Sequence, residues 1–456
     1  MASSPVVPAR RQPAGLPLPP LVQILLWAFA PIALLRWCER RYGSTFVLRL
    51  PGVHFTMTSD PELIRLAFAA PPSAYEVRDS NKILRPLVGD HSLLLLEGQA
   101  HLRERRLMTP PFHGERMQVH GAVMVDATEA VMARWPRHER FSLHAAMQEI
   151  TLEIILRAVF GIDAEGKLER LREITPRLLD TLASPWSLII GATGEIVVPW
   201  ALRPFERWLP ARPFEEARAA LDEAILDEIT RRRTTGERGD DVLSMLIDAR
   251  DESGQPMSDI ELRDEMVTLL VAGHETSANT LSWAFCHLLS NPETLARLKV
   301  ELDEGVGDAR ITPAHLPNLP YLEAVLKETL RLTPILPLVG RHLRVDLQTA
   351  DTVVPAGTTL APCVYLAHHR ADQWEHPERF EPERFLEGRI APHAWFPFGG
   401  GARRCLGMAF SMLEMRLILA TIVRGASLRL APGYRPRLTR RSITFTPSKG
   451  VPVVCS

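Results

Sequence analysis

The sequence predicts a mainly α-helical protein with small β-sheets, a fold of the α+β class. Amphipathic periodicity of about 3.6 residues runs through most of the chain, and β-rich text is confined to short stretches. One helical segment continues without a break from Ser258 to Asn291. A helix of that length exceeds the usual globular range, so we expect it to cross the whole molecule.

The N-terminal elements are predicted from composition and periodicity. Residues 1–20, rich in Pro, Ala and Arg, predict an extended tail, with order beginning near Leu21. The apolar stretch from Leu21 to Leu35 predicts a packed amphipathic helix. It is shorter than the roughly 18 to 20 apolar residues that a membrane span requires, so we expect no membrane anchor. The alternating segment 44–59 predicts a two-strand hairpin. Further helices are predicted after Asp60-Pro61 and near 97–108, 115–134, 143–160, 166–183 and 212–232.

The long helix has a start signal and a stop signal. Ser258 and Glu261 have the spacing of a capping box, and Asn291-Pro292 ends the pattern. Gly273 near its middle costs about 1 kcal/mol relative to Ala, a cost usually accepted for a kink or for close approach to something bound. We then expect a helix near 318–333, β-rich text up to 365, a loop over 370–404, a last helix from Leu406 to Arg424 and a β-rich end. No break in composition divides residues 21–456, which we expect to form a single domain.

Composition excludes several classes of protein. The 53 Lys and Arg residues balance 54 Asp and Glu residues to a net charge of −1, so no basic field favours nucleic acid. A hydrophobic content of 46% and a charged content of 23% are typical of a globular chain. The five cysteines are far apart and contain no CxxC, which supports neither a disulfide framework nor a closed zinc site. We therefore expect a reducing, cytoplasmic location.

The most informative segment is FGGGARRCLG, which spans Phe398 to Gly407. Its three consecutive glycines let the backbone fold tightly and approach a flat ligand. Cys405 lies where this loop meets the N-terminus of the last helix, and helix amides together with Arg403 and Arg404 favour a thiolate. We therefore expect Cys405 to meet a metal or an electrophile.

The spacing F-x-x-G-x-R-x-C-x-G is filled by Phe398, Gly401, Arg403, Cys405 and Gly407, and a random match is on the order of 10⁻⁷ per starting position. The loop resembles the haem-binding loop of the cytochrome P-450 superfamily, in its soluble bacterial type. The resemblance implies a triangular domain around a buried haem b (iron protoporphyrin IX), with Cys405 as the axial ligand of the iron. It also implies that Arg403 pairs with a propionate, that Phe398 packs against the thiolate side of the porphyrin and that Gly407 adjoins the cofactor.

Glu328 and Arg331 in KETLR match the family's E-x-x-R, whose spacing puts both groups on one helix face. In the family this pair is buried and completed by an arginine from a P-E-R-F segment. The sequence contains that tetrapeptide twice, so the third member is Arg384 or Arg379, and its placement after F-x-P favours Arg384. These residues are expected to be structural.

The text AGHET, from Ala272 to Thr276, resembles the family's A/G-G-x-D/E-T on the long helix. Thr276 can bond to a carbonyl one turn back or turn its hydroxyl toward a water. The resemblance implies that Glu275 and Thr276 are catalytic and deliver protons during oxygen activation. Ala272 is then expected to adjoin both cofactor and substrate.

Further residues match the family's cofactor and substrate positions. His101 and Arg105 in GQAHLRERRL match W-x-x-x-R with His in place of Trp, and Arg341 matches another propionate-pairing arginine. Arg103 and Arg106 are expected to face solvent. The substrate pocket is expected to be apolar. Its expected members are Leu94, Leu95, Ala272, Leu336, Val339 and Thr444.

The implied function is a monooxygenase that inserts one oxygen atom from O2 into an apolar substrate, by hydroxylation or epoxidation. The chain has no G-x-G-x-x-G between a strand and a helix, so we expect a separate electron donor, a ferredoxin or flavodoxin with its reductase. Arg103, Arg106, Arg403 and Arg404 would suit docking of such an acidic donor. We expect a monomer that binds no nucleic acid.

Two other classes compete with this interpretation. A hydrolase or transferase would use Cys405 as a nucleophile activated by His369 or His393, but it leaves the ordered arginines unexplained. A non-catalytic helical binding protein leaves the glycine loop unexplained. Within the haem class, an isomerase or a carbon-coupling enzyme is a further alternative.

Overall fold

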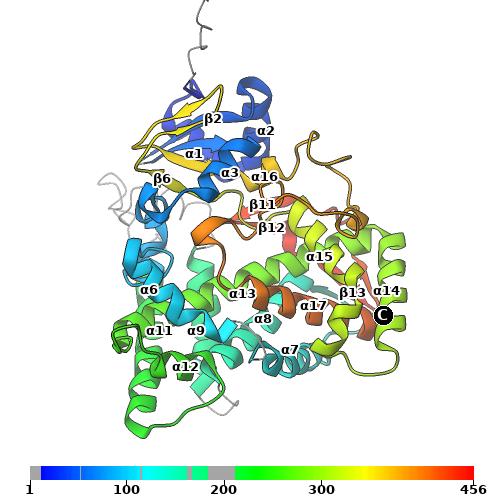
Figure 1. Cartoon of the computed structure of the whole chain (residues 1–456). Coiled ribbons are helices and arrows are strands. Elements are labelled where there is room, and N and C mark those ends of the chain that lie inside the picture. The colour runs from blue at the N-terminus through cyan, green and yellow to red at the C-terminus, as the bar shows by residue number, and fades with distance from the viewer. Residues whose placement is uncertain (1–11, 52, 113–115, 162–166, 183–210) are drawn as a thin grey trace, which may run out of the picture.

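The computed structural model describes residues 12–51, 53–112, 116–161, 167–182 and 211–456. Helices fill the lower part of the molecule in Figure 1, and a six-stranded sheet with α1 and α2 lies at the top. The predicted α+β class with small sheets is therefore confirmed.

The helices follow the predicted periodicity closely. They are α1 (Pro20–Phe29), α2 (Pro31–Tyr42), α3 (Pro61–Ala69), α4 (Arg78–Asn81), α5 (Arg85–Val88), α6 (Gly98–Met108), α7 (Arg116–Met132), α8 (Leu143–Phe160), α9 (Lys167–Leu182), α11 (Ala211–Thr235), α12 (Val242–Asp248), α13 (Asp259–Ser290), α14 (Pro292–Val306), α15 (Pro320–Leu332), α16 (Val364–Ala367) and α17 (Met408–Gly425). The sequence analysis missed α12, α14 and the short helices α4, α5 and α16. Pro292 ends α13 and also begins α14, because a proline at the first helical position loses no hydrogen bond.

The strands form four small sheets. They are β1 (Ala14–Gly15), β2 (Thr45–Leu50), β3 (Val53–Thr58), β4 (Tyr75–Glu76), β5 (Arg140–Ser142), β6 (Arg341–Leu343), β7 (Leu347–Gln348), β8 (Val353–Val354), β9 (Thr359–Pro362), β10 (Leu428–Leu430), β11 (Leu438–Arg441), β12 (Thr444–Pro447) and β13 (Pro452–Cys455). The largest has the order β1-β2-β3-β9-β6-β4, and the others are β10-β13-β5, β11-β12 and β7-β8. The predicted hairpin is the β2-β3 pair, with Thr45 opposite Thr58.

Two predictions for the N-terminal region were wrong. Order begins before Leu21, because β1 pairs in parallel with β2 and Leu16 is buried in the core. The apolar stretch is two helices rather than one, because Pro31 has no N–H to continue the first. Within the described residues, no helix is long and apolar enough to cross a membrane.

Helix α13 runs through the middle of the molecule and packs against α8, as its length predicts (Figure 1). The Ser258 amide donates to Glu261 over 2.7 Å and the Glu261 amide donates to Ser258 over 3.2 Å, which completes the predicted capping box. A Cβ on Gly273 would lie 2.7 Å from Cδ1 of Ile155 on α8. The close approach at Gly273 is therefore helix packing.

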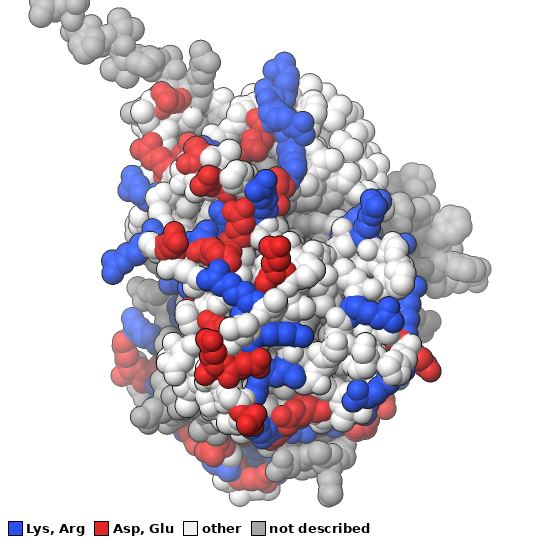
Figure 2. Space-filling model, turned by 90° about the vertical axis from the view of Figure 1, so that its right-hand side faces the viewer, with Lys and Arg blue, Asp and Glu red and all other residues white. Residues whose placement is uncertain are grey.

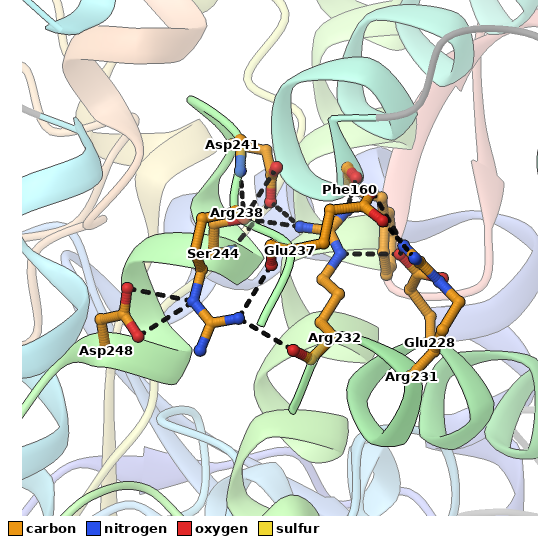
Figure 3. Close-up of polar contacts among 10 residues, drawn as sticks. Phe160, Glu228, Arg231, Arg232, Glu237, Arg238, Asp241, Ser244 and Asp248 are labelled. Carbon is orange, nitrogen blue, oxygen red and sulfur yellow. Dashed lines mark hydrogen bonds and ion pairs between the residues drawn. The ribbon is translucent and has the colours of Figure 1, made fainter. Parts of the chain in front are cut away.

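A buried arginine joins α11 to α12 away from this axis (Figure 3). Arg232 donates to Glu228 over 2.7 Å, to Asp241 over 2.6 Å and to Ser244 over 2.7 Å, and it also contacts the Phe160 carbonyl. Its charge is balanced by two carboxylates, as a buried cation requires.

Candidate functional site

A cavity of about 640 Å³ lies between α13 and the loop that precedes α17. Ligand pockets in proteins commonly measure 300 to 1,000 Å³. One arm of the cavity extends away from this loop to α1 and to the β2-β3 hairpin. Residues of that arm include Ile24, Trp27, Ala28, Leu50, Val53 and Phe55.

The cysteine loop is held in a tight conformation by its glycines. Gly399 and Gly401 have φ values of +67° and +65°, and a Cβ on Gly401 would collide with the carbonyl oxygen of Phe68 on α3. The Cys405 amide donates to the Phe398 carbonyl over 3.0 Å, which closes the loop. Glycine is needed in this loop because the loop packs closely against α3. Cys405 lies in the cavity wall.

Cys405 has accessible surface although it lies deep in the protein. Cys405 is deep and still accessible because the exposed surface of its side chain is part of the cavity wall. Burial raises the pKa of the Cys405 thiol, while the Gly407 amide and the charges of Arg105 and Arg404 lower it. Burial outweighs the other causes in the free protein, so a cationic partner is required to hold the thiolate that the sequence predicts.

The structure brings His101, Arg105, Arg341 and Arg403 to the same cavity. Burial lowers the pKa of His101 to about 3, and the charges of these three arginines lower it further. Burial also lowers the pKa of Arg403 to about 10. His101 is therefore neutral at physiological pH.

The three arginines have no carboxylate partner among the described residues. Arg403 donates to the carbonyls of Leu93 and Leu96, and Arg341 donates to the Gly340 carbonyl over 2.8 Å and faces the Tyr75 ring. Arg105 makes no hydrogen bond or ion pair to a described residue, and burial lowers its pKa. Unpaired cations are costly inside a protein, so this rim fits a ligand that carries carboxylates.

The side chains around Cys405 match what a flat group with a single protein ligand requires. In the described part of the chain, no three His, Cys, Asp or Glu side chains gather as a metal cluster. A single sulfur, a glycine loop, Phe398 in the wall and a cationic rim suit a planar group with two propionates. The residues present therefore fit a haem.

On the α13 side, Ala272, Glu275 and Thr276 face the cavity. The Thr276 hydroxyl donates to the Ala272 carbonyl over 2.6 Å, which is back-bonding one turn earlier. Burial raises the pKa of Glu275, and the charge of Arg441 and a hydrogen bond from Asn279 lower it. A buried carboxyl and a hydroxyl are thus adjacent at this wall, as the motif predicts.

Arg441 on β11 is a site residue that the sequence analysis missed. Its Nε lies 3.7 Å from Oε1 of Glu275, and its guanidinium also pairs with Asp180 on α9. Asp180 is largely exposed and Glu275 is buried. Two adjacent arginines in a four-residue strand give no sequence signal for such a contact.

The apolar wall agrees with the predicted pocket at all but one position. Leu94, Leu336, Val339 and Thr444 face the cavity. Leu95 does not, because its side chain is 1% exposed and belongs to the main core. The turn at Ser92 to Leu95 directs Leu93 and Leu94 to the cavity instead.

The structural triad is assembled at full burial. Glu328 and Arg331 are both 0% exposed and are joined by bonds of 2.6 and 2.8 Å. Arg384 completes the triad through a 3.1 Å bond to Glu328. Arg379 contributes only its backbone carbonyl, which accepts from Arg331. The choice left open between the two arginines is therefore settled for Arg384.

The basic residues expected to dock a donor are not a free patch. Arg103 pairs with Asp251 over 2.7 Å and with Glu261 over 3.1 Å, and Arg106 pairs with Glu252. Arg403 belongs to the cavity, which leaves Arg404 exposed. On the face in Figure 2, acidic and basic side chains are interspersed.

The structure also tests the nucleophile alternative. The cavity wall that contains Cys405 includes neither His369 nor His393. His369 contacts the Tyr365 carbonyl over 2.7 Å and lies beside the Tyr365 ring. The histidine at the cavity is His101, whose pKa of about 3 makes it a poor base. The geometry therefore does not support a cysteine hydrolase.

Comparison with known proteins agrees with this site. The model of the cytochrome P450 family matches residues 13–452. Two relatives from Mycobacterium tuberculosis (strain ATCC 25618 / H37Rv), cytochromes P450 135B1 and 138, are 38% and 32% identical to the chain. The matches cover 96% and 100% of this chain and 90% and 98% of the relatives.

Two solved structures show the same fold. A retinoic acid-bound cyanobacterial CYP120A1 has a TM-score of 0.84 at 24% identity and covers 98% of this chain and 100% of its own. A cytochrome P450DA haem domain has a TM-score of 0.85 at 22% identity and covers 98% of both chains. By its sequence and its fold, the chain belongs to the cytochrome P450 family, whose members are generally haem-thiolate monooxygenases that use dioxygen, an apolar substrate and redox partners.

Proposed function

We propose that this protein is a haem b monooxygenase whose iron is bound by Cys405. The observation that carries the proposal is the position of Cys405 in the wall of a cavity whose cationic rim has no carboxylate partner among the described residues. When bound, the haem would supply activation of dioxygen, so that one oxygen atom enters a C–H or C=C bond and the other leaves as water. Residues 21–456 would form one domain around it.

The chain's own residues have separate roles in this proposal. Arg105, Arg341 and Arg403 would neutralise two propionates, and neutral His101 would donate a hydrogen bond to one of them. Phe398 would cover the sulfur side and exclude water from the thiolate. Each of these residues binds or orients the cofactor and transfers no proton.

On the opposite wall, Glu275 would hold a proton and Thr276 would pass it on through its hydroxyl. The raised pKa of Glu275 favours the protonated form. Thr276 would have to exchange its bond to the Ala272 carbonyl for a bond to water. This relay keeps bulk water out of the cavity while it supplies protons one at a time.

The substrate would be an apolar organic molecule. Leu94, Leu336 and Val339 give it an apolar wall, and Ala272 leaves room beside the cofactor. Electrons would come from a separate ferredoxin or flavodoxin. Arg404 is the exposed basic residue next to the cysteine loop on which such a donor could dock.

The experiment that tests this proposal is a spectrum of the purified protein. We expect a red protein whose reduced carbon monoxide complex has the strongly red-shifted Soret band of thiolate ligation. Cys405→Ala should lose that band. Cys286→Ala is the matched control, because Cys286 is buried in α13 outside the cavity and should keep it. A colourless wild-type protein, or an unchanged band in Cys405→Ala, would overturn the proposal.

A further inference from the structure

The cavity contains a charged residue that the proposed function does not use. Arg440, on β11, faces the arm of the cavity that extends to α1. Its guanidinium lies 4.5 Å from the centre of the Trp27 ring. No described carboxylate pairs with it, and burial, the one cause acting on it, lowers its pKa to about 9.

Part of the position of Arg440 is explained by the fold. Its Nη1 donates to the Trp27 carbonyl over 3.0 Å, and its Nε donates to the Ser442 carbonyl over 2.9 Å. The Trp27 carbonyl lies in the last turn of α1, where the residue four positions later is Pro31, which has no N–H. Arg440 therefore caps α1 and joins it to the β11-β12 hairpin.

This structural role leaves one edge of the guanidinium unused. The two bonds use two of the five N–H donors, and Nη2 makes no hydrogen bond to a described residue. The positive charge faces the Trp27 ring but has no carboxylate partner among the described residues. Both carbonyls need only a neutral N–H donor, so these two bonds do not explain why a charge is buried here. The retained charge therefore calls for an anion.

The neighbouring residue provides an internal comparison. Arg441 follows on the same strand and pairs with two carboxylates, Asp180 and Glu275. The acidic residues in the wall of the main cavity are Glu275 and Glu414, and neither acts on Arg440. Of these two arginines, only Arg440 has its charge open to a ligand.

The surroundings of Arg440 define what the rest of that ligand must be. The arm beside it is apolar, with Ile24, Val53 and Phe55 in its wall. The β11-β12 hairpin lies between α1 and α13 (Figure 1). The cavity that Arg440 lines also has Ala272 and Thr276 in its wall. An elongated apolar chain with an anionic head matches this shape and charge.

We propose that Arg440 binds the carboxylate of an amphipathic substrate whose apolar chain extends along the cavity toward Cys405. This inference rests on the proposed function for the reaction, but binding of the ligand does not require it. It narrows the substrate class from apolar molecules in general to long-chain carboxylic acids. Arg440 is then a specificity-determining residue.

The test compares three probes of equal chain length by titration calorimetry: dodecanoate, methyl dodecanoate and dodecan-1-ol. We expect the wild-type protein to bind dodecanoate about 10- to 100-fold more tightly than the two neutral probes, because a hydrogen bond to a charged group adds that much affinity. Equal affinity for all three probes in the wild type would overturn the inference without any variant.

Two variants and one control locate the effect. Arg440→Gln keeps an amide donor near the Ser442 carbonyl but carries no charge and should lose the preference for dodecanoate, while Arg440→Lys keeps a charge and should retain part of it. Arg441→Gln removes an equal charge from the same strand and should keep the preference. A preference that persists in Arg440→Gln, or disappears equally in Arg441→Gln, would assign the carboxylate to another site.

The same titration separates this inference from the proposed function. Calorimetry reports binding without a haem signal, so discrimination that depends on Arg440 in a protein lacking the thiolate spectrum would leave the inference standing and remove the proposed reaction. A normal thiolate spectrum with no discrimination would remove the inference alone. Both results are readable from one preparation.

Discussion

Five arginines that are buried or half-buried form two groups that differ in whether a carboxylate accompanies them. Arg331 and Arg232 lie in the helical body, and each is bonded to carboxylates and carbonyls that the fold supplies. Arg105, Arg341 and Arg403 face the cavity, and none of them forms an ion pair with a described residue.

The difference teaches how to separate a structural charge from a binding charge. A buried ion pair adds little net stability, yet loss of one partner is expensive because the other charge is left alone. A buried cation without a partner already destabilises the free protein, and an anionic ligand that pairs with it removes this destabilisation. The two groups should therefore respond in opposite ways to mutation.

The largest effect is expected where the compensated group is broken. Glu328→Gln should lower the free energy of unfolding by about 3 to 5 kcal/mol, because Arg331 would remain fully buried without a carboxylate. Chemical denaturation of the variant and wild type measures this loss. Glu149→Gln is the control, since the Arg134–Glu149 pair is exposed and should change stability by less than about 1 kcal/mol. Similar losses in the two variants would contradict the comparison.

A smaller and opposite effect is expected at the cavity rim. Arg105→Met should leave the unfolding free energy of the haem-free protein unchanged or raised, because the arginine has no described partner there. The same change should speed haem loss about 10- to 100-fold, measured by transfer to excess apomyoglobin.

Arg106→Met is the matched control for this prediction. Arg106 follows Arg105 on α6 but is exposed and paired with Glu252. Its loss should affect neither haem release nor stability by a measurable amount. If Arg105→Met destabilises the haem-free protein and leaves haem release unchanged, Arg105 belongs to the structural group.

Arg441 has carboxylate partners, but one of them, Glu275, faces the cavity, and this makes its effect intermediate. Arg441 lowers the pKa of Glu275, and Asp180 raises it. Arg441→Gln should therefore keep Glu275 protonated to higher pH, whereas Asp180→Asn should let it ionise at lower pH. Coupling, measured as the product formed per O2 consumed, should change with pH as Glu275 ionises. We expect the pH at which this change occurs to move by about one unit, in opposite directions in the two variants.

Arg437→Gln serves as the control for that pair of variants. Arg437 is exposed on the approach to β11, and no ion pair joins it to a described residue. Arg437→Gln should leave the pH at which coupling changes as it is in wild type. If the pH at which coupling changes moves in the same direction in both Arg441→Gln and Asp180→Asn, the change in coupling does not arise from Glu275.

Most of the fold could be predicted from local signals. Helix α13 is defined by its capping box at Ser258 and by Asn291-Pro292, and α8 by unbroken periodicity. The errors arose where a signal has two meanings. Pro31 and Pro292 each separate two helices, because proline ends one helix and starts the next equally well.

The site could be predicted where spacing is local and could not where contacts are distant. His101 and Arg105 are four residues apart on one helix face, so their shared direction follows from periodicity. Arg441 meets Glu275 across 166 positions in the chain, through a hairpin whose orientation depends on the assembled core. Leu95 failed for a related reason, because one turn decides which of four leucines faces the cavity.

The smallest effect is expected at low pH at Glu414 on α17, the acidic counterpart of the unpaired arginines. Its side chain is buried beside Ser277, Oε1 has no hydrogen-bond partner, and burial raises its pKa to about 8. The carboxyl is therefore neutral at pH 7. Glu414→Gln has nearly the same shape and polarity as the protonated carboxyl, so below pH 4.5 its unfolding free energy should lie within about 1 kcal/mol of wild type.

The pH dependence of Glu414→Gln should reveal the difference that low pH hides. Because the pKa of Glu414 is about 8 in the folded protein and about 4.5 when unfolded, the native state binds the extra proton between these values. Its contribution to stability is complete below pH 4.5 and is lost as the pH rises through 8, at up to about 1.4 kcal/mol per unit. Urea unfolding from pH 5 to 9 should show a shallower decline in Glu414→Gln than in wild type, while other buried acids contribute equally to both. Parallel curves would mean that Glu414 ionises without cost and has a cationic partner after all.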